Sequence, residues 1–423
     1  MALTRAGMRR YLADTAPLAN PHFRRLWTAN IATVIGAQVS IVAVPAQIYA
    51  TTGSSAYVGL TGAFGLVPLV VFGLWGGALA DVADRRTVLL ITTWGLILTS
   101  VAFWAQAAMG SHNVWLLLGI FAVQQAFFAV NQPTRTAVLP KLLPAAQLPA
   151  ANSLSMTLFG AGAVAGPLVG GALIPVLGFS WLYLLHTITL FPTLWAVWKL
   201  PPLTVQGAVG RPGLRSVIAG FSYLRGHPVL LMSFGVDLIA MFFGMPRALY
   251  PEIAHDSFGG PISGGLAFAI LFAAMPAGVL LGGVFSGWVS RVRRHGLAVI
   301  VAILVWGLSV SAFGLAVVGA TGPNGRLLAL AAAALAVGGA ADMASSAFRQ
   351  SMLQSAAEDD VRGRLQGVFV VVVAGGPRLA DVAHGAAAQV WGASATVIGG
   401  GVLVVVGVLA AAALVPAFVR YRV

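Results

Sequence analysis

The sequence contains no cysteine, which excludes disulfide bonds, thiolate metal sites and cysteine nucleophiles. Charge is also scarce, since Asp, Glu, Lys and Arg make up 8% of the 423 residues, whereas soluble domains carry about 25%. Hydrophobic residues make up 59%. Such a chain has too few polar side chains to cover a water-facing globule, so we expect a bundle of helices in a lipid bilayer.

Several function classes lack their sequence signatures. There is no His-Glu-x-x-His motif and no phosphate-binding Gly-x-x-x-x-Gly-Lys-Ser/Thr loop, so metalloprotease chemistry and direct ATP drive are disfavoured. No stretch resembles a channel filter, and we expect neither cofactor nor metal. A receptor would bring a soluble domain, whereas the longest expected loop is 201–227. A non-transporting receptor or membrane enzyme therefore stays only as an alternative from another class.

What the chain does contain is a series of long apolar runs. A membrane span needs roughly 20 apolar residues. By this measure the sequence predicts twelve spans, which we place at 26–50, 56–80, 87–109, 113–138, 150–174, 179–199, 228–250, 262–289, 296–319, 327–351, 365–391 and 394–418.

The basic residues indicate how the spans are oriented. The net charge of +13 comes from short Arg and Lys clusters between apolar runs, which argues for membrane topology and against nucleic acid as a partner. With both termini in the cytoplasm nearly all Arg and Lys lie inside, and only Arg247, Arg326 and Arg378 fall in the outer half. The positive-inside rule therefore predicts cytoplasmic termini.

The break between the sixth and seventh spans divides the chain. We expect a cytoplasmic arm at 1–25, a six-helix bundle at 26–200, a cytoplasmic loop at 201–227 and a second six-helix bundle at 228–423. Leu214, Val217, Ile218, Phe221 and Leu224 recur at helical spacing in the loop, which indicates an amphipathic helix on the membrane surface. A linker helix that touches nothing is the alternative.

A charged hairpin separates the second and third spans. Gly77, Leu79, Ala80, Asp81, Arg85 and Arg86 form the pattern Gly-x-Leu-Ala-Asp-x-x-x-Arg-Arg. Small residues before it, among them Gly73, Gly76 and Gly77, would let another helix approach closely. The pattern resembles the loop 2–3 signature of the major facilitator superfamily of transporters, although Val82 stands where that signature usually has Arg.

Further stretches resemble the enterobactin-exporter and drug-exporter branch of that superfamily. They occur in family order at 20–27, 52–56, 133–140, 148–154, 166–171 and 361–364. The resemblance implies an all-α membrane protein with twelve transmembrane helices in two six-helix bundles, which rock about a central site. It does not fix the substrate, because the branch includes siderophore exporters, drug pumps and a lysophospholipid flippase.

Three acids fall at membrane depth, where a charge is costly unless it faces a wet cavity or a partner. They are Asp237, Asp342 and Asp381, and with His384 they are our candidates for proton coupling. Asp237 could instead pair with an Arg of another helix, and Asp342 with Arg349. Arg378 and Asp381 share one helical face, so we expect them to neutralise one another unless Arg378 attracts an anionic ligand.

Amide, apolar and basic side chains supply the remaining candidates. Those for substrate binding are Gln38, Gln124, Gln125, Asn131, Met241, Phe242 and Arg378. Amides within a bundle could equally tie helices together. The resemblance further implies an inner gate formed by Asp81, Arg85, Arg86, Arg135 and Arg349.

The sequence therefore predicts a secondary transporter of the bacterial inner membrane. We expect it to export an amphipathic small molecule, a siderophore or a drug, by alternating access and proton antiport. Its partners would be that substrate, protons and the lipid bilayer, and we expect a monomer. Lipid flipping or metabolite uptake is the alternative within transport.

Overall fold

The computed structural model describes residues 14–203, 222–356 and 359–422, with the side chains of 74–82 and 355–371 left aside. Within this part of the chain every regular element is a helix. The amphipathic helix predicted for the loop at 201–227 lies largely outside the described residues, as does most of the predicted arm.

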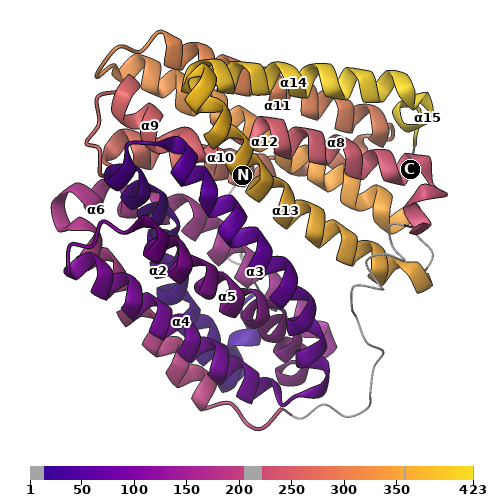
Figure 1. Cartoon of the computed structure of the whole chain (residues 1–423). Helices are drawn as coiled ribbons and strands as arrows, with labels where there is room; N and C mark the ends of the chain where they lie inside the picture. The colour runs from indigo at the N-terminus through magenta and orange to yellow at the C-terminus, as the bar shows by residue number, and fades with distance from the viewer. Residues whose placement is uncertain (1–13, 204–221, 357–358, 423) are drawn as a thin grey trace, which may run out of the picture.

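The first half of the chain forms one group of packed helices (Figure 1). α2 and α6 pack together along their lengths, and α4 and α5 complete the group with α3. The elements are η1 (Ala16–Ala19), α2 (Pro21–Thr52), α3 (Ser55–Val82), α4 (Arg85–Ala108), α5 (Val114–Leu142), η2 (Ala145–Gln147) and α6 (Leu148–Trp198).

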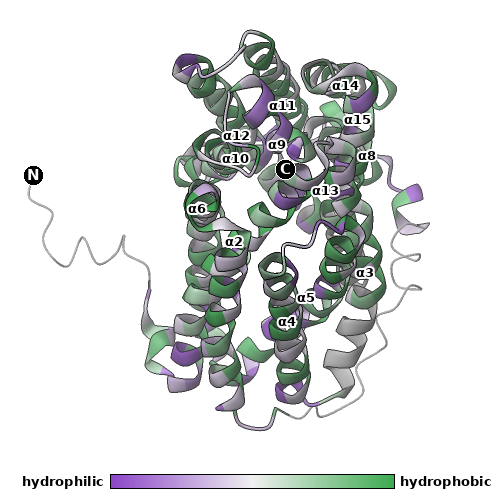
Figure 2. Cartoon of the chain, turned by 60° about the vertical axis from the view of Figure 1, so that its left-hand side comes forward, coloured by the Kyte–Doolittle hydropathy of each residue, from purple (hydrophilic) through white to green (hydrophobic). Residues whose placement is uncertain are grey.

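The second half forms another group, in which α11 packs on α12 and α14, and α10 on α12. Its elements are α8 (Pro228–Gly244), η3 (Arg247–Leu249), α9 (Tyr250–Glu252), the π-helical turn η4 (Ile253–Ser257), α10 (Leu266–Val284), η5 (Ser286–Arg291), α11 (His295–Val318), α12 (Gly325–Ala356), α13 (Asp359–Trp391), α14 (Ala393–Leu414) and α15 (Pro416–Val419). Figure 2 shows hydrophobic residues running along the helices of both groups.

All twelve predicted spans fall on helices, although ten helices of the described residues are long and apolar enough to cross a membrane. Two predicted spans, 150–174 and 179–199, lie in α6, where Gly178 is the single non-helical residue with φ 75°. The span at 365–391 lies in α13, which the ten do not include. The number of crossings therefore stays a prediction.

Local sequence explains where the helices begin. Asn20 precedes α2, and its Oδ1 accepts hydrogen bonds from the N–H groups of His22 and Phe23 at 2.9 and 3.2 Å. Asp84 precedes α4 and accepts from the Thr87 N–H at 3.0 Å. Each side chain satisfies donors that a helix N-terminus leaves free.

The two bundles meet along two seams, α3 with α13 and α6 with α10. We call the side on which α2 begins and α14 ends the terminus side, and the opposite one the far side. At the α3–α13 seam a Cβ on Gly62 would lie 2.0 Å from the carbonyl oxygen of Arg378, so glycine allows this approach. At Gly73 no described atom lies within 4 Å of the Cβ position, and because the neighbouring side chains of α13 are not described, a close approach there stays a prediction.

On the far side, hydrogen bonds join the bundles. Gln389 Nε2 donates to Ser54 Oγ at 2.7 Å, and the Gly265 N–H donates to the Gly171 carbonyl at 2.9 Å. Two acids take part as well: the Tyr49 hydroxyl donates to Asp256 at 3.2 Å, and the Ser55 hydroxyl donates to Glu252. In this conformation the far side is closed.

Candidate functional site

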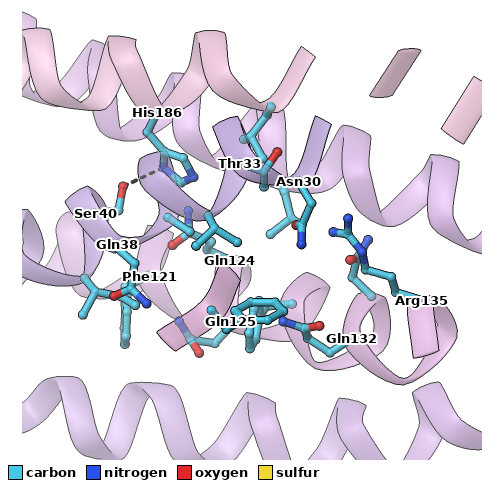
Figure 3. A pocket seen from close by; sticks show the side chains of 18 of the residues that line it. Asn30, Thr33, Gln38, Ser40, Phe121, Gln124, Gln125, Gln132, Arg135 and His186 are labelled. Carbon is cyan, nitrogen blue, oxygen red and sulfur yellow. Dashed lines mark hydrogen bonds between the residues drawn. The ribbon is translucent and has the colours of Figure 1, made fainter. Parts of the chain in front are cut away.

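Three adjoining chambers lie between the bundles. The first, the amide chamber, has a volume of about 370 Å³ and is drawn in Figure 3. Its polar lining comes mainly from α2 and α5 and consists of Asn30, Thr33, Gln38, Ser40, Gln124, Gln125, Asn131, Gln132, Arg135, His186 and Arg378. Of the sequence candidates, Gln38, Gln124, Gln125, Asn131, Arg135 and Arg378 thus meet in one place.

Two arginines give the amide chamber its charge. Arg135 donates to the Leu26 carbonyl at 3.4 Å. Arg378 donates to Gln125 Oε1 at 3.1 Å, and its guanidinium lies 5.5 Å from the centre of the Phe121 ring. Among the described residues neither arginine forms a salt bridge. The chamber is therefore positively charged and rich in hydrogen-bond donors.

The polar side chains of the chamber differ in whether they already have hydrogen-bond partners. Asn131 Nδ2 donates to Thr92 Oγ1 at 2.8 Å, so it ties α5 to α4. Gln124 is buried and its Nε2 has no hydrogen-bond partner within the described structure. Figure 3 shows the bond between Ser40 Oγ and His186 Nδ1, 2.6 Å long, at the edge of the chamber. An unpaired buried donor is costly, so Gln124 is available to a ligand.

The second, the methionine chamber, is larger, about 750 Å³. It lies between α6 and α10 and adjoins the amide chamber, since Gln38 and Ile41 line both. Four methionines line it, Met156, Met245, Met275 and Met343, together with the polar side chains of Thr157, Arg247, Tyr250 and Asp342.

The third, the far chamber, has a volume of about 360 Å³ and shares Arg378 with the amide chamber and Arg247 with the methionine chamber. Asp381 lines it and accepts from Arg247 at 3.0 Å. The expectation that Arg378 neutralises Asp381 is therefore wrong: η3 brings Arg247 to Asp381, while Arg378 reaches across the α3–α13 seam to Gln125. Sequence spacing along α13 could not show a partner that lies 134 positions away.

Asp237 and Arg349 form a second ion pair, closed off inside the second bundle. Arg349 Nη1 lies 2.5 Å from Asp237 Oδ2, and the side chains are 2% and 1% exposed. Of the two possibilities for Asp237, the structure shows the pair with an arginine of another helix. Arg349 is consequently paired with Asp237 rather than with Asp342, and its role in an inner gate stays a prediction.

Asp342 lies in the wall of the methionine chamber. It forms no hydrogen bond or salt bridge with any described residue, and it is only partly buried. Of the three membrane acids, Asp342 is thus the one without a bonded cation.

The remaining coupling and substrate candidates lie outside the three chambers. His384 Nδ1 and Nε2 lie 2.9 and 3.0 Å from the carbonyls of Ala380 and Phe243, and a neutral imidazole can donate only one of these bonds. Phe242 and His384 line a separate lateral pocket between α8, α13 and α14. Met241 is buried in the core, against Gly376.

The hairpin motif is described in part. Arg85 Nη1 donates to the Ala137 carbonyl and Arg86 Nη2 to the Trp198 carbonyl, both at 2.8 Å. These bonds fasten the start of α4 to α5 and α6 within the first bundle. The Asp81 side chain lies outside the described residues.

Sequence reasoning missed three contributors. Arg247 stood out only as an outer arginine, and its role became visible when η3 placed it beside Asp381. Tyr250 is buried, lines the methionine chamber, and its hydroxyl has no partner among the described atoms. Asn30 carries an amide signal like that of Gln38, and the rule that singled out Gln38 would have found it.

Two helical bundles around a charged central cavity define a multi-pass membrane transport protein. The sequence signature of the transmembrane secretion effector family matches residues 12–419. The chain belongs to this family, within the major facilitator superfamily, and is a secondary transporter rather than an enzyme.

Characterised proteins agree with this assignment. The chain is 29% identical over 360 residues to the enterobactin exporter EntS of Escherichia coli O1:K1, covering 83% of this chain and 81% of the exporter. It has the fold of the nucleoside transporter NupG, with a TM-score of 0.72, 14% identity, and coverage of 93% and 98% of the two chains. A bacterial homologue of the iron transporter ferroportin in an inward-facing state gives a TM-score of 0.68 at 14% identity, with coverage of 94% and 98%.

Proposed function

We propose that the protein exports an anionic, amphipathic small molecule of the siderophore kind from the bacterial cytoplasm, by alternating access and in exchange for protons. The observation that carries this proposal is the presence of Arg135 and Arg378 in one chamber, with no salt-bridge partner among the described residues. Both arginines are partly buried, where an uncompensated charge is costly, and an anionic ligand would offset that cost.

The surroundings of the two arginines favour a ligand with many oxygen acceptors and aromatic surface. Gln124 and Gln125 offer amide donors, and Phe121 and Phe128 line the same chamber. Guanidinium groups bind carboxylates and other planar oxyanions through paired hydrogen bonds. EntS, the relative named above, is an exporter of enterobactin, and its substrate class fits this chemistry.

Direction and orientation follow from the charge pattern. Arg24, Arg25, Arg85, Arg86 and Lys199 all lie on the terminus side of the first bundle. By the positive-inside rule this side would be cytoplasmic, which supports an inner-membrane protein with both termini inside. The closed far side then faces outward, so this conformation would receive substrate from the cytoplasm.

Asp342 is the acid best placed for proton exchange. It faces the methionine chamber without a bonded cation, whereas Asp237 and Asp381 are held by Arg349 and Arg247. A carboxyl group that a cavity reaches can exchange its proton with either side as the bundles rock. We therefore assign proton exchange to Asp342 and structural pairing to Asp237.

Transport into inverted vesicles tests the proposal. With an acidic lumen, enterobactin uptake should be stimulated by the gradient and abolished by a protonophore. Arg378→Gln should lower uptake about tenfold, the loss of one charged hydrogen bond. The matched control Arg326→Gln, an exposed arginine on the far side, should leave uptake unchanged.

A second variant separates proton coupling from substrate translocation. Asp342→Asn should lose stimulation by the gradient and keep exchange of labelled for unlabelled substrate across the membrane. A wild-type protein that ignores the gradient contradicts proton exchange. A clear preference for a macrolide or a lysophospholipid over enterobactin contradicts the siderophore assignment.

A further inference from the structure

The size and apolar lining of the methionine chamber are not explained by the binding of an anionic group. It is the largest of the three chambers, and α6 and α10 form two of its walls. Arg247, one of its two charged residues, is already paired with Asp381. Most of its surface is apolar, from Met275, Val279, Leu280 and similar side chains.

Methionine is the side chain that adapts most readily to the shape of an apolar ligand, because it is unbranched and polarizable. Met156, Met245, Met275 and Met343 come from three helices and the segment before η3. They surround the same space from different directions. Such a wall fits an apolar group of variable shape better than a rigid polar one.

The seam between α6 and α10 widens from the far side toward the terminus side. At its far end a Cβ on Gly171 would lie 2.9 Å from Ala269, so the backbones nearly touch. Toward the terminus side Gly160 leaves room for ordinary contact with Leu280, 3.5 Å from the Cβ position.

Beyond Gly160 the seam reaches the outer surface of the protein. Met156 and Val284 line the chamber and are nevertheless 75% and 71% exposed. Both residues belong to helices that are long and apolar enough to cross a membrane. The chamber thus has an exposed apolar edge on two helices that could span a membrane.

We propose that the methionine chamber binds the hydrocarbon or aromatic part of the substrate, and that this part arrives from the cytoplasmic leaflet through the α6–α10 seam. The anionic group of the same molecule lies in the amide chamber, which the apolar part reaches past Gln38 and Ile41, the residues common to both chambers. This assignment rests on the proposed function, since it takes the anionic group from there.

Two fluorescent probes distinguish the apolar site from the anion site. Dansylglycine and dansylaminoundecanoic acid share a fluorophore and a carboxylate and differ in the length of the chain between them. Wild-type protein in nanodiscs should bind the long probe at least about tenfold more tightly, the effect of burying roughly two methylene groups. Equal affinities for the two probes, or no binding of the long one, would overturn the proposal.

A larger side chain placed inside the chamber can be compared with the same side chain placed just outside it. Ala163 on α6 lines the methionine chamber, whereas Ala161, two residues earlier, is exposed and lines none of the chambers. Ala163→Trp should remove the advantage of the long probe without weakening dansylglycine, and Ala161→Trp should leave both affinities unchanged. The smaller change Ala163→Leu should give an intermediate loss, and it replaces the Trp variant if that variant does not fold.

The same probes separate this proposal from the proposed function. If Arg378→Gln leaves the binding of dansylglycine intact, the anion site is wrong, while the chain-length effect and its loss in Ala163→Trp still support the apolar site. If Ala163→Trp weakens both probes equally, the apolar site is wrong and the anion site stands.

The absence of cysteine allows the access route to be tested with a thiol crosslinker. Gly160 and Leu280 face each other across the α6–α10 seam, and Gly375 and Leu66 do so across the α3–α13 seam, with Cβ-to-Leu Cδ1 distances of 3.5 and 3.6 Å. Crosslinked Gly160→Cys/Leu280→Cys should slow association of the long probe about tenfold, whereas crosslinked Leu66→Cys/Gly375→Cys should not. Equal slowing by both crosslinks would overturn the lateral route.

Discussion

The buried pair of Asp237 and Arg349 allows a quantitative prediction. The two charges lie 2.5 Å apart with almost no exposure to solvent. Removing one partner of such a pair leaves an uncompensated buried charge and costs about 3–5 kcal/mol, whereas replacing both partners together is often nearly neutral. We therefore expect Asp237→Asn to lose about 3–5 kcal/mol of stability. The double variant Asp237→Asn/Arg349→Gln should lose much less.

The magnitude follows from what Arg349 retains in the single variant. Its Nε still donates to Ser345 Oγ at 3.2 Å, but its charge has no other bonded carboxylate among the described residues. The double variant removes that charge and should recover at least about half of the lost stability, which is roughly 2 kcal/mol.

Unfolding of the purified protein in detergent, followed through a double-mutant cycle, measures both quantities. Asp342→Asn is the matched control, because it makes the same chemical change on an acid without a bonded cation, and it should cost less than about 1 kcal/mol. Should Asp237→Asn be as stable as the wild type, or the double variant be no better than Asp237→Asn, the reasoning about the pair fails.

Three further predictions concern helix packing and capping. Gly62→Ala places a methyl group against the backbone of Arg378 at the α3–α13 seam and should cost about 1–3 kcal/mol, measured as a lower midpoint of thermal unfolding; an unchanged midpoint would mean that the seam can open. Tyr183→Phe removes the hydroxyl that donates to Gln47 Oε1 at 2.9 Å and should cost about 0.6 kcal/mol, whereas a cost of several kcal/mol would contradict a simple helix-to-helix bond. Burial opposes the ionised form of Asp84, but hydrogen bonds from Thr87 and the Leu203 N–H outweigh it and hold the pKa of Asp84 below its usual value. Its contribution to stability is therefore complete above the unfolded pKa of about 3.9 and is lost as the pH falls through the folded pKa. In Asp84→Asn the free energy of unfolding should therefore fall less steeply as the pH is lowered through this range.

Periodicity and length predicted the helical fold well, because a bilayer leaves the backbone few choices. The runs that gave the spans at 26–50 and 87–109 became α2 and α4, and Gly178 lies in the gap between the predicted spans 150–174 and 179–199. The span predicted at 365–391 from its apolar run lies in α13, part of which falls among the residues whose side chains are not described.

Partners between charged residues were harder to predict. The amides of the first bundle lie on α2 and α5 at spacings that one helix face explains, and they meet in the amide chamber. The pairs Asp237 with Arg349 and Asp381 with Arg247 join elements that are distant in sequence. Spacing along one helix favours the nearest charge, whereas packing decides which charge the side chain meets.

The turn at Gly178 has a mechanical consequence. Because one residue separates the two halves of α6, the half that lines the α6–α10 seam and the half that carries His186 form a stiff hairpin with little slack. A sideways displacement of the first half would therefore displace the second half as well. The hydrogen bond between His186 and Ser40 would pass this movement on to α2.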